Sequence, residues 1–407
     1  MRRVCTALLW AALLFNTCYG QYNLLNTDPS AVDTTTKIRQ CMVVGFDGKH
    51  AVITGRDAVN PSITKLGQDI AANGLGGVIL YGRNIEVKQQ VINLSAFLQQ
   101  SSTQAPLLIG VDQEGGQVQR LKLEHNFNNY DSAASVAFRT NGVVAKTYYS
   151  HMAQELAEAG INWNFGPVVD VNPTDGVPCP VIGGKDRSYG SKPKIVTSYA
   201  SAFVEGHREN GVHTAIKHFP GHGSAKGDTH KGMTDVTDVW DAERELQPYK
   251  DMIATGHVDS IMTSHIFHRG IDPKNPASLS PEFIQKKLRG KMGYDGLVVS
   301  DDLCMGAILE HYKAIPDNPD SVYNALAQAG IQALKAGSDM IMFSYNNAAS
   351  NGLNVEMPDT VERFVTSATK AVEDGTLSEK RLNEAFSRVM AFKKKLVKPV
   401  GIDAKLD

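Results

Sequence analysis

The chain has 407 residues, of which 42% are hydrophobic and 21% are charged. This length allows two or three ordinary domains or one large α/β barrel, and it is enough to bury a core without disulfide or metal support. The formal net charge is only −2. Because nucleic-acid binding requires a concentrated basic surface, we expect no nucleic-acid partner.

The first twenty residues have the pattern of an export signal. Two arginines precede the apolar stretch Val4–Phe15, and the small residues Cys18 and Gly20 precede a cleavage site before Gln21. A membrane anchor is the alternative reading, but the stretch is short for a bilayer span. The residues before Cys18 disfavour lipid attachment there. We expect a secreted or periplasmic protein that is not inserted in a membrane once the leader is removed.

Three of the five cysteines lie beyond the leader, namely Cys41, Cys179 and Cys304. An odd number without metal-like spacing does not form a disulfide scaffold. One bridge at most can form, and we expect buried free thiols.

After a polar lead-in over residues 21–36, short apolar runs alternate with longer helical stretches. The runs are continuously apolar, as in strands buried on both faces of a parallel sheet. The eight runs are Cys41–Phe46, Gly77–Tyr81, Leu107–Val111, Ile161–Val171, Val212–Lys217, Ser260–His265, Gly296–Ser300 and Met340–Ser344.

The stretches between the runs have helical spacing. One helix is expected around Ile195–Gly206, and another around Val322–Ala333, with Asp320 or Ser321 as its N-cap and Gly337 at its end. Eight such units predict a (β/α)8 barrel. A doubly wound open sheet is the alternative, although the glycine fingerprint expected after its first strand is missing.

Residues 359–396 are predicted to form two helices, with a turn near Gly375 and Ser378, that pack on the barrel. We therefore expect a single catalytic domain over residues 37–396, followed by a tail over residues 397–407.

Ionisable residues stand at the ends of five predicted strands, and in a barrel the strand ends share one rim. Each of them taken alone can be a helix cap, but five together favour a polar pocket. They are Asp112 with Glu114, Asp170, Lys217 with His218, His265, and Asp301 with Asp302.

The loop over residues 221–230 is rich in glycine, and we expect it to be mobile and exposed. Asp228 and His230 are close enough on it for the carboxylate to orient the imidazole, which then acts as an acid and a base. Asp301 is the candidate nucleophile, kept ionised by Lys217 and Arg187.

A metal centre is the competing interpretation of these residues. Their nitrogen and oxygen atoms suit zinc in a barrel hydrolase, but the usual His-x-His and His-x-x-x-His pairs are missing. We therefore predict no metal and no other cofactor. The candidate ligands are His218, His222, Asp228, His230, His265 and Asp301.

The order of the motifs resembles that of glycoside hydrolase family 3, in its β-N-acetylhexosaminidase branch, over residues 37–396. The motifs are Asp112-Gln113-Glu114-Gly115-Gly116, Asp186-Arg187-Ser188, Lys217-His218-Phe219-Pro220-Gly221-His222-Gly223, Gly227-Asp228-Thr229-His230, Met262-Thr263-Ser264-His265 and Ser300-Asp301-Asp302. Each short motif is weak alone, but the ordered succession is specific.

The resemblance implies an exo-acting retaining β-N-acetylglucosaminidase that acts on cell-wall muropeptides or chitooligosaccharides. By its pattern Asp301 is the nucleophile, and Asp228 with His230 forms the acid/base pair. The sugar at the non-reducing end is then held by Asp112, Arg120, Arg187, Lys217 and His218. Two departures concern the sugar contacts: Gln117 stands where the family usually has arginine, and an insertion precedes Arg187.

Other functions stay open at this stage. Pocket details can instead select a β-glucoside or a β-xyloside. An imidazole acid/base also tolerates phosphate as the attacking group, which is the chemistry of a glycoside phosphorylase. A catalytically dead sugar-binding protein is disfavoured by the intact Asp228, His230 and Asp301.

Overall fold

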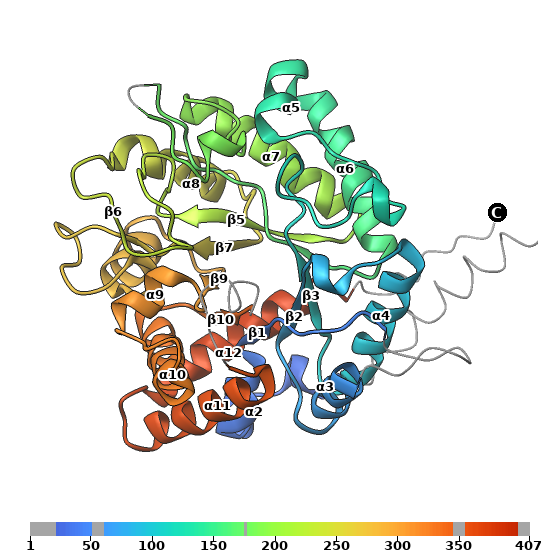
Figure 1. Ribbon diagram of the computed structural model, residues 1–407, viewed down its shortest axis with the longest axis vertical. Helices are drawn as coiled ribbons and strands as arrows, with labels where there is room; N and C mark the ends of the chain where they lie inside the picture. Colours follow the sequence, from blue (N-terminus) through green and yellow to red (C-terminus); the bar gives the residue numbers. More distant parts are fainter. Residues whose placement is uncertain (1–21, 51–60, 175–176, 345–354, 398–407) are drawn as a thin grey trace, which may run out of the picture.

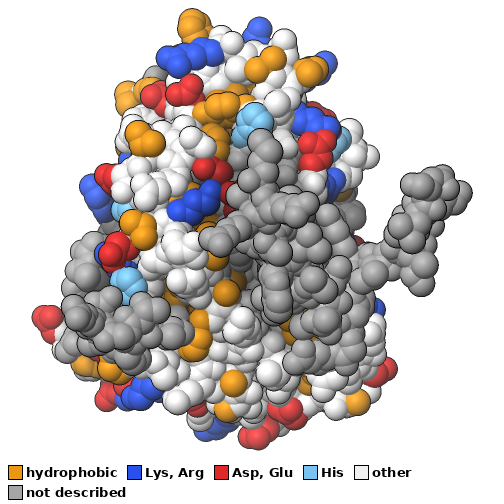
Figure 2. Space-filling view, turned by 90° about the vertical axis from the view of Figure 1, so that its right-hand side faces the viewer, with side chains coloured by type: hydrophobic (Ala, Val, Ile, Leu, Met, Phe, Trp, Pro, Cys, Tyr) orange, Lys and Arg blue, Asp and Glu red, His pale blue; other side chains and the backbone are white. Residues whose placement is uncertain are grey.

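The computed structural model describes residues 22–50, 61–174, 177–344 and 355–397. The predicted leader, Cys18 and the tail beyond residue 397 lie outside the described residues. Within the described part, no helix has the length and apolar character that crossing a bilayer requires. On the face in Figure 2, acidic and basic side chains are interspersed instead of forming one basic patch.

A closed ring of eight parallel strands forms the centre of the molecule, as predicted. The ring closes between the first and last strands, where Met42 pairs with Ile341. Around the ring the strands are β1 (Met42–Val44), β10 (Met340–Phe343), β9 (Leu297–Asp302), β7 (Ser260–Thr263), β5 (His213–Phe219), β4 (Trp163–Asn164), β3 (Leu108–Val111) and β2 (Gly77–Leu80). The open-sheet alternative is therefore wrong.

The fourth strand is much shorter than the predicted run Ile161–Val171. Only Trp163–Asn164 forms a strand, and beyond it Val168 makes an isolated bridge to Lys217. Pro167 lies between them and has no N–H group to donate to a ladder. A continuous apolar run indicates that a segment is buried. It does not indicate how much of that segment is hydrogen-bonded as a strand.

Helices surround the ring (Figure 1). They are α2 (Thr34–Gln40), α3 (Pro61–Asn73), α4 (Lys88–Ser101), α5 (Ala133–Arg139), α6 (Gly142–Glu158), α7 (Pro193–Glu209), α8 (Ala242–Ala254), the π-helix η7 (Glu282–Lys291), α9 (Gly306–His311), α10 (Pro319–Ala336), α11 (Met357–Glu373) and α12 (Glu379–Lys394). A two-stranded parallel pair, β6 (Thr234–Asp235) and β8 (Ile266–Phe267), lies outside the ring.

The helix α10 is capped by Asn318, not by Asp320 or Ser321 as predicted. The Asn318 side chain accepts a hydrogen bond from the Ser321 N–H at 3.1 Å, because Pro319 occupies the first helical position. The predicted end at Gly337 is correct, and its φ of 119° suits glycine.

The two C-terminal helices pack on the barrel, as predicted. Figure 1 shows α11 and α12 beside α2, so that the beginning and the end of the described chain meet. Phe392 of α12 packs on Trp163 and His213, with ring centroids 5.4 and 4.7 Å apart. Because these two residues begin β4 and β5, α12 covers the amino-terminal end of the barrel. Cys41 and Cys179 are free and buried, as expected, and Cys304 is buried as well.

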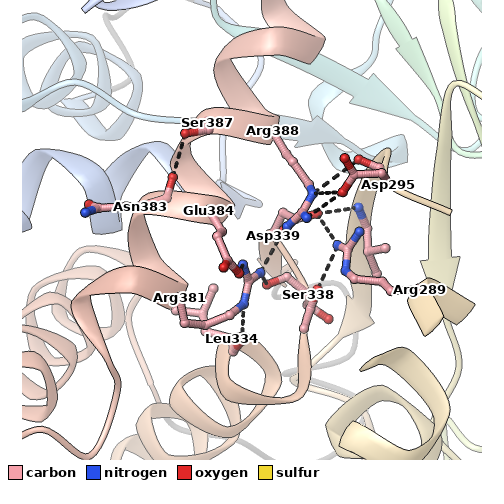
Figure 3. A network of polar contacts seen from close by, with 12 residues as sticks. Arg289, Asp295, Leu334, Ser338, Asp339, Arg381, Asn383, Glu384, Ser387 and Arg388 are labelled. Atoms are coloured by element: carbon pink, nitrogen blue, oxygen red, sulfur yellow. Dashed lines mark hydrogen bonds and ion pairs between the residues drawn. The ribbon is translucent and has the colours of Figure 1, made fainter. Parts of the chain in front are cut away.

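A buried ion cluster fixes α12 to the barrel (Figure 3). Asp339, which directly precedes β10, is fully buried and lies 2.7 Å from the guanidinium groups of both Arg289 and Arg381. Arg388 approaches it at 3.4 Å, and the Val298 N–H donates to it at 2.9 Å. One carboxylate thus joins η7, β9 and α12.

We predict that Asp339→Ala lowers the free energy of unfolding by about 3–5 kcal/mol, because it leaves buried guanidinium groups without their counter-charge. Denaturant titration of the wild type and the variant measures this change. Glu384→Ala is the control, since Glu384 is 40% exposed where it pairs with Arg381; it should cost about 1 kcal/mol or less. Equal losses in the two variants would contradict the assigned role of Asp339.

Candidate active site

The carboxyl ends of the parallel strands bring the predicted polar residues to one rim of the barrel. Asp112 follows β3, Lys217 and His218 lie in β5, and Asp301 lies at the end of β9. His265 follows β7 on the same rim. The side chains of this rim come from segments far apart in sequence, and parallel pairing alone places them together.

The two adjacent aspartates at the end of β9 have different environments. Asp302 is buried, and its carboxylate accepts hydrogen bonds from the N–H groups of Ser344 at 2.8 Å and Cys304 at 3.0 Å, as well as from the Ser344 hydroxyl. Asp301 is partly exposed and accepts from the Asp302 N–H at 2.8 Å. Asp302 thus holds the turn after β9, and Asp301 is the carboxylate available to a substrate.

These environments also shift the pKa values of the two carboxyl groups in opposite directions. Burial raises the pKa of Asp302 above its ordinary value. Burial also raises the pKa of Asp301, but the nearby imidazoles, His265 first, outweigh this and lower it. Asp301 is therefore the more acidic of the two carboxyl groups.

The prediction that Lys217 and Arg187 keep Asp301 ionised is wrong. The ammonium group of Lys217 lies 2.8 Å from Asp112 and 2.7 Å from Glu114. Arg187 makes a two-pronged pair with Glu114, at 2.8 Å for each hydrogen bond. Both cations are thus neutralised by other carboxylates.

Asp228 and His230 form a hydrogen-bonded pair on the loop after β5. The Nδ1 atom of His230 lies 2.7 Å from Asp228 Oδ1, and the His230 N–H donates to the same oxygen at 3.0 Å. A carboxylate only accepts, so Nδ1 carries a proton and Nε2 is left to exchange one. The His230 side chain is 47% exposed, so its Nε2 atom is accessible from solvent.

The loop that carries this pair is less exposed than predicted. Its first part is buried, and a Cβ atom added at Gly223 would lie 1.8 Å from the Val171 carbonyl oxygen. The His222 N–H donates to Asp170 at 2.8 Å, and the His222 ring faces Cys179 at 3.5 Å and Thr229 at 3.4 Å. The glycines here permit close packing, which composition alone does not distinguish from mobility.

A second group of charges lies on the same rim as Asp301. Asp112 bridges Lys217 and Arg120, the latter at 3.2 Å. Burial raises the pKa of Asp112, but Lys217 and Arg120 hold it well below the ordinary value. Burial lowers the pKa of Lys217, but Asp112 and Glu114 raise it above the ordinary value. All of these groups are charged at neutral pH, so the rim offers fixed donors and acceptors.

Glu114 and Asp170 belong to this group, although we assigned them no role from the sequence. Glu114 pairs with both Arg187 and Lys217. Asp170 lies 2.7 Å from His218 Nδ1, and the other ring nitrogen of His218 faces Arg187 at 3.3 Å. The only signal in the sequence was that both carboxylates stand at strand ends.

The six candidate metal ligands are not gathered into one centre. Within the part of the chain that the structure describes, no three His, Cys, Asp or Glu side chains are arranged to hold a metal ion. His218 faces Asp170, and His265 lies between the Ser278 hydroxyl at 2.7 Å and the Asp302 carbonyl at 2.9 Å. These ring nitrogens are engaged in hydrogen bonds.

Comparison with known proteins places the chain in one family of glycoside hydrolases. The sequence model described as the glycosyl hydrolase family 3 N terminal domain matches residues 34–392. A protein of Tolumonas auensis named beta-hexosaminidase is 35% identical over 281 residues, which is 68% of this chain and 77% of that protein. Beta-hexosaminidase A of Pseudoalteromonas piscicida is 29% identical over 84% of this chain.

A solved structure is also similar, namely a glycoside hydrolase family 3 beta-N-acetylglucosaminidase from a Paenibacillus species. It has a TM-score of 0.76 and 31% identity over 92% of this chain. The match spans 65% of the Paenibacillus protein, and the match to the Pseudoalteromonas protein spans 57% of that one.

We predict that Glu114→Gln destabilises the protein most at neutral pH. Burial raises the pKa of Glu114, but Arg187 and Lys217 lower it to about 2 from an ordinary value of 4.5. Because its folded-state pKa is depressed, the stability that it contributes is complete above 4.5 and is lost as the pH falls toward 2. Denaturant titration at pH 7, 5 and 3 should therefore show the two proteins converging in stability. A constant difference would contradict the pairing.

Proposed function

We propose the following function for this chain, which belongs to glycosyl hydrolase family 3: it is an exo-acting β-N-acetylglucosaminidase that works with retention of configuration. One observation carries the proposal. The Asp228–His230 pair and the ionised Asp301 occur on one rim of the barrel, beside a cluster of fixed charges. A retaining glycosidase needs a nucleophile and an acid/base group on opposite sides of one bond.

In the first step the Asp301 carboxylate attacks the anomeric carbon. The protonated His230 gives its Nε2 proton to the glycosidic oxygen, which leaves with the aglycone. Asp228 faces Nδ1 at 2.7 Å, so it orients the ring and stabilises the imidazolium. The product of this step is an ester between Asp301 and the sugar.

In the second step a water molecule attacks the anomeric carbon of this ester. Neutral His230 takes the proton of the water at Nε2, and Asp301 leaves as a carboxylate. Two inversions give net retention, and both residues return to their starting states. No further cofactor enters the proposed reaction.

We assign the terminal sugar to the charged cluster beside Asp301. Asp112 is 16% exposed and Arg120 is 26% exposed, so their outer atoms can accept from and donate to sugar hydroxyl or carbonyl groups. Lys217, Arg187 and His218 are more buried. In this proposal Lys217 holds Asp112 in place, and Arg187 and His218 support the cluster behind it through Glu114 and Asp170.

The substrate class in this proposal is an N-acetylglucosamine-containing oligosaccharide, either a cell-wall muropeptide or a chitooligosaccharide. The names of the similar beta-hexosaminidases and of the Paenibacillus beta-N-acetylglucosaminidase support the sugar. Export through the leader of residues 1–20 is part of the proposal and would place the enzyme beside such polymers.

A panel of aryl β-glycosides, assayed with and without inorganic phosphate, tests the function. We expect turnover of the N-acetylglucosaminide well above that of the glucoside and the xyloside, with free sugar as the product. A sugar phosphate formed only with phosphate would identify a phosphorylase instead. Activity lost to a chelator and restored by zinc would favour the metal-dependent alternative.

We predict different losses for the two central residues. Asp301→Ala should abolish turnover of every substrate in the panel, because no ester can form. His230→Ala should slow substrates with poor leaving groups by about 10²–10⁴-fold, the usual contribution of a general acid. Activated aryl glycosides, whose leaving groups depart without protonation, should lose far less in that first step. Equal losses by His230→Ala across a leaving-group series would count against its acid role.

A further inference from the structure

The chain segment directly after the nucleophile contacts the loop that carries the proton donor. Asp301 lies at the end of β9, and α9 begins at Gly306. The Gly306 N–H donates to the carbonyl oxygen of His230 at 3.1 Å, and the Ala307 N–H donates to that of Thr229 at 3.1 Å. The backbone of the acid/base pair is thus hydrogen-bonded to the same segment that carries the nucleophile.

A side chain of α9 adds a third contact. Glu310 Oε2 accepts a hydrogen bond from the Met233 N–H at 2.6 Å. The approach is close, since a Cβ atom added at Gly232 would lie 2.8 Å from the same oxygen. Glu310 is exposed, so its substitution removes this contact without opening the core.

The contact between the two backbones also requires glycine at position 306. A Cβ atom added at Gly306 would lie 2.7 Å from the His230 carbonyl oxygen and 2.6 Å from the Lys231 carbonyl carbon. Real Cβ contacts are not this short, so a residue larger than glycine at position 306 must displace the loop. No positive φ is involved here, and the close approach is the constraint.

We propose that Gly306 and Glu310 are positioning residues for the acid/base pair. They fix the loop with His230 to the segment that follows Asp301, so that one stretch of backbone sets the spacing between proton donor and nucleophile. Proton transfer needs heavy atoms within about 3 Å of each other, and a shift of about 1 Å can cost a hundredfold in rate. The inference rests on the proposed acid role of His230.

The first test compares Glu310→Ala with Glu310→Gln. We expect Glu310→Ala to lower kcat/KM about tenfold for substrates with poor leaving groups and little for activated ones, which steepens the dependence on leaving-group pKa. Glu310→Gln should restore most of the rate, because its amide oxygen still accepts from the Met233 N–H. A uniform loss for all leaving groups would overturn the proposal.

Glu282→Ala is the matched control, since this glutamate is 36% exposed and pairs with Lys286 in its own helix. It should leave the leaving-group dependence unchanged. Gly306→Ala is the second variant and should reproduce the steeper dependence of Glu310→Ala without removing any hydrogen-bonding side chain. A wild-type dependence in Gly306→Ala would also overturn the proposal.

Hydrogen–deuterium exchange gives a readout that does not depend on activity. Peptides covering residues 228–236 should exchange faster in Glu310→Ala than in the wild type or in Glu282→Ala. Unchanged exchange would show that Glu310 does not hold the loop. If exchange rises while His230→Ala shows no leaving-group effect, the loop contact is correct and the proposed function is what fails.

Discussion

The parallel pairing of eight strands into a closed ring is the constraint on which the rest of this structure depends. Parallel hydrogen bonding points every strand the same way, so every carboxyl end reaches one rim. Asp112, Lys217 and Asp301 come from three separate segments of the chain, yet they lie together there. The opposite rim is covered by α12 through Phe392.

Charges on the polar rim and beneath the barrel serve different purposes. Around Glu114 and Lys217, each charge is paired with another. Two side chains of this group, Asp112 and Arg120, are partly exposed. Around Asp339 the carboxylate is fully enclosed by guanidinium groups that tie helices to the ring. Burial of paired charges fixes geometry in both places, but only the group around Glu114 and Lys217 has members, Asp112 and Arg120, on the rim that carries Asp301.

Much of the fold could be predicted from the sequence, because burial on both faces leaves a continuous apolar run for each strand. The end of β4 could not be predicted in this way, since Pro167 interrupts the backbone hydrogen bonds of the strand inside such an apolar run. The choice between Asp301 and Asp302 depends on Ser344, which directly follows the neighbouring strand β10 and bonds to Asp302. The contact of Glu310 could not be predicted from the sequence, because its partner is a backbone N–H on a distant loop.

The pairing of β1 with β10 has a consequence for folding during synthesis. Met42 and Ile341 pair across almost the whole described chain, and α12 follows later still. A nascent polypeptide leaving the ribosome therefore presents an unpaired β1 edge until β10 has been synthesised. Such long-range pairing forms more slowly than local contacts, and the open strand edge leaves intermediates prone to aggregation until the ring closes.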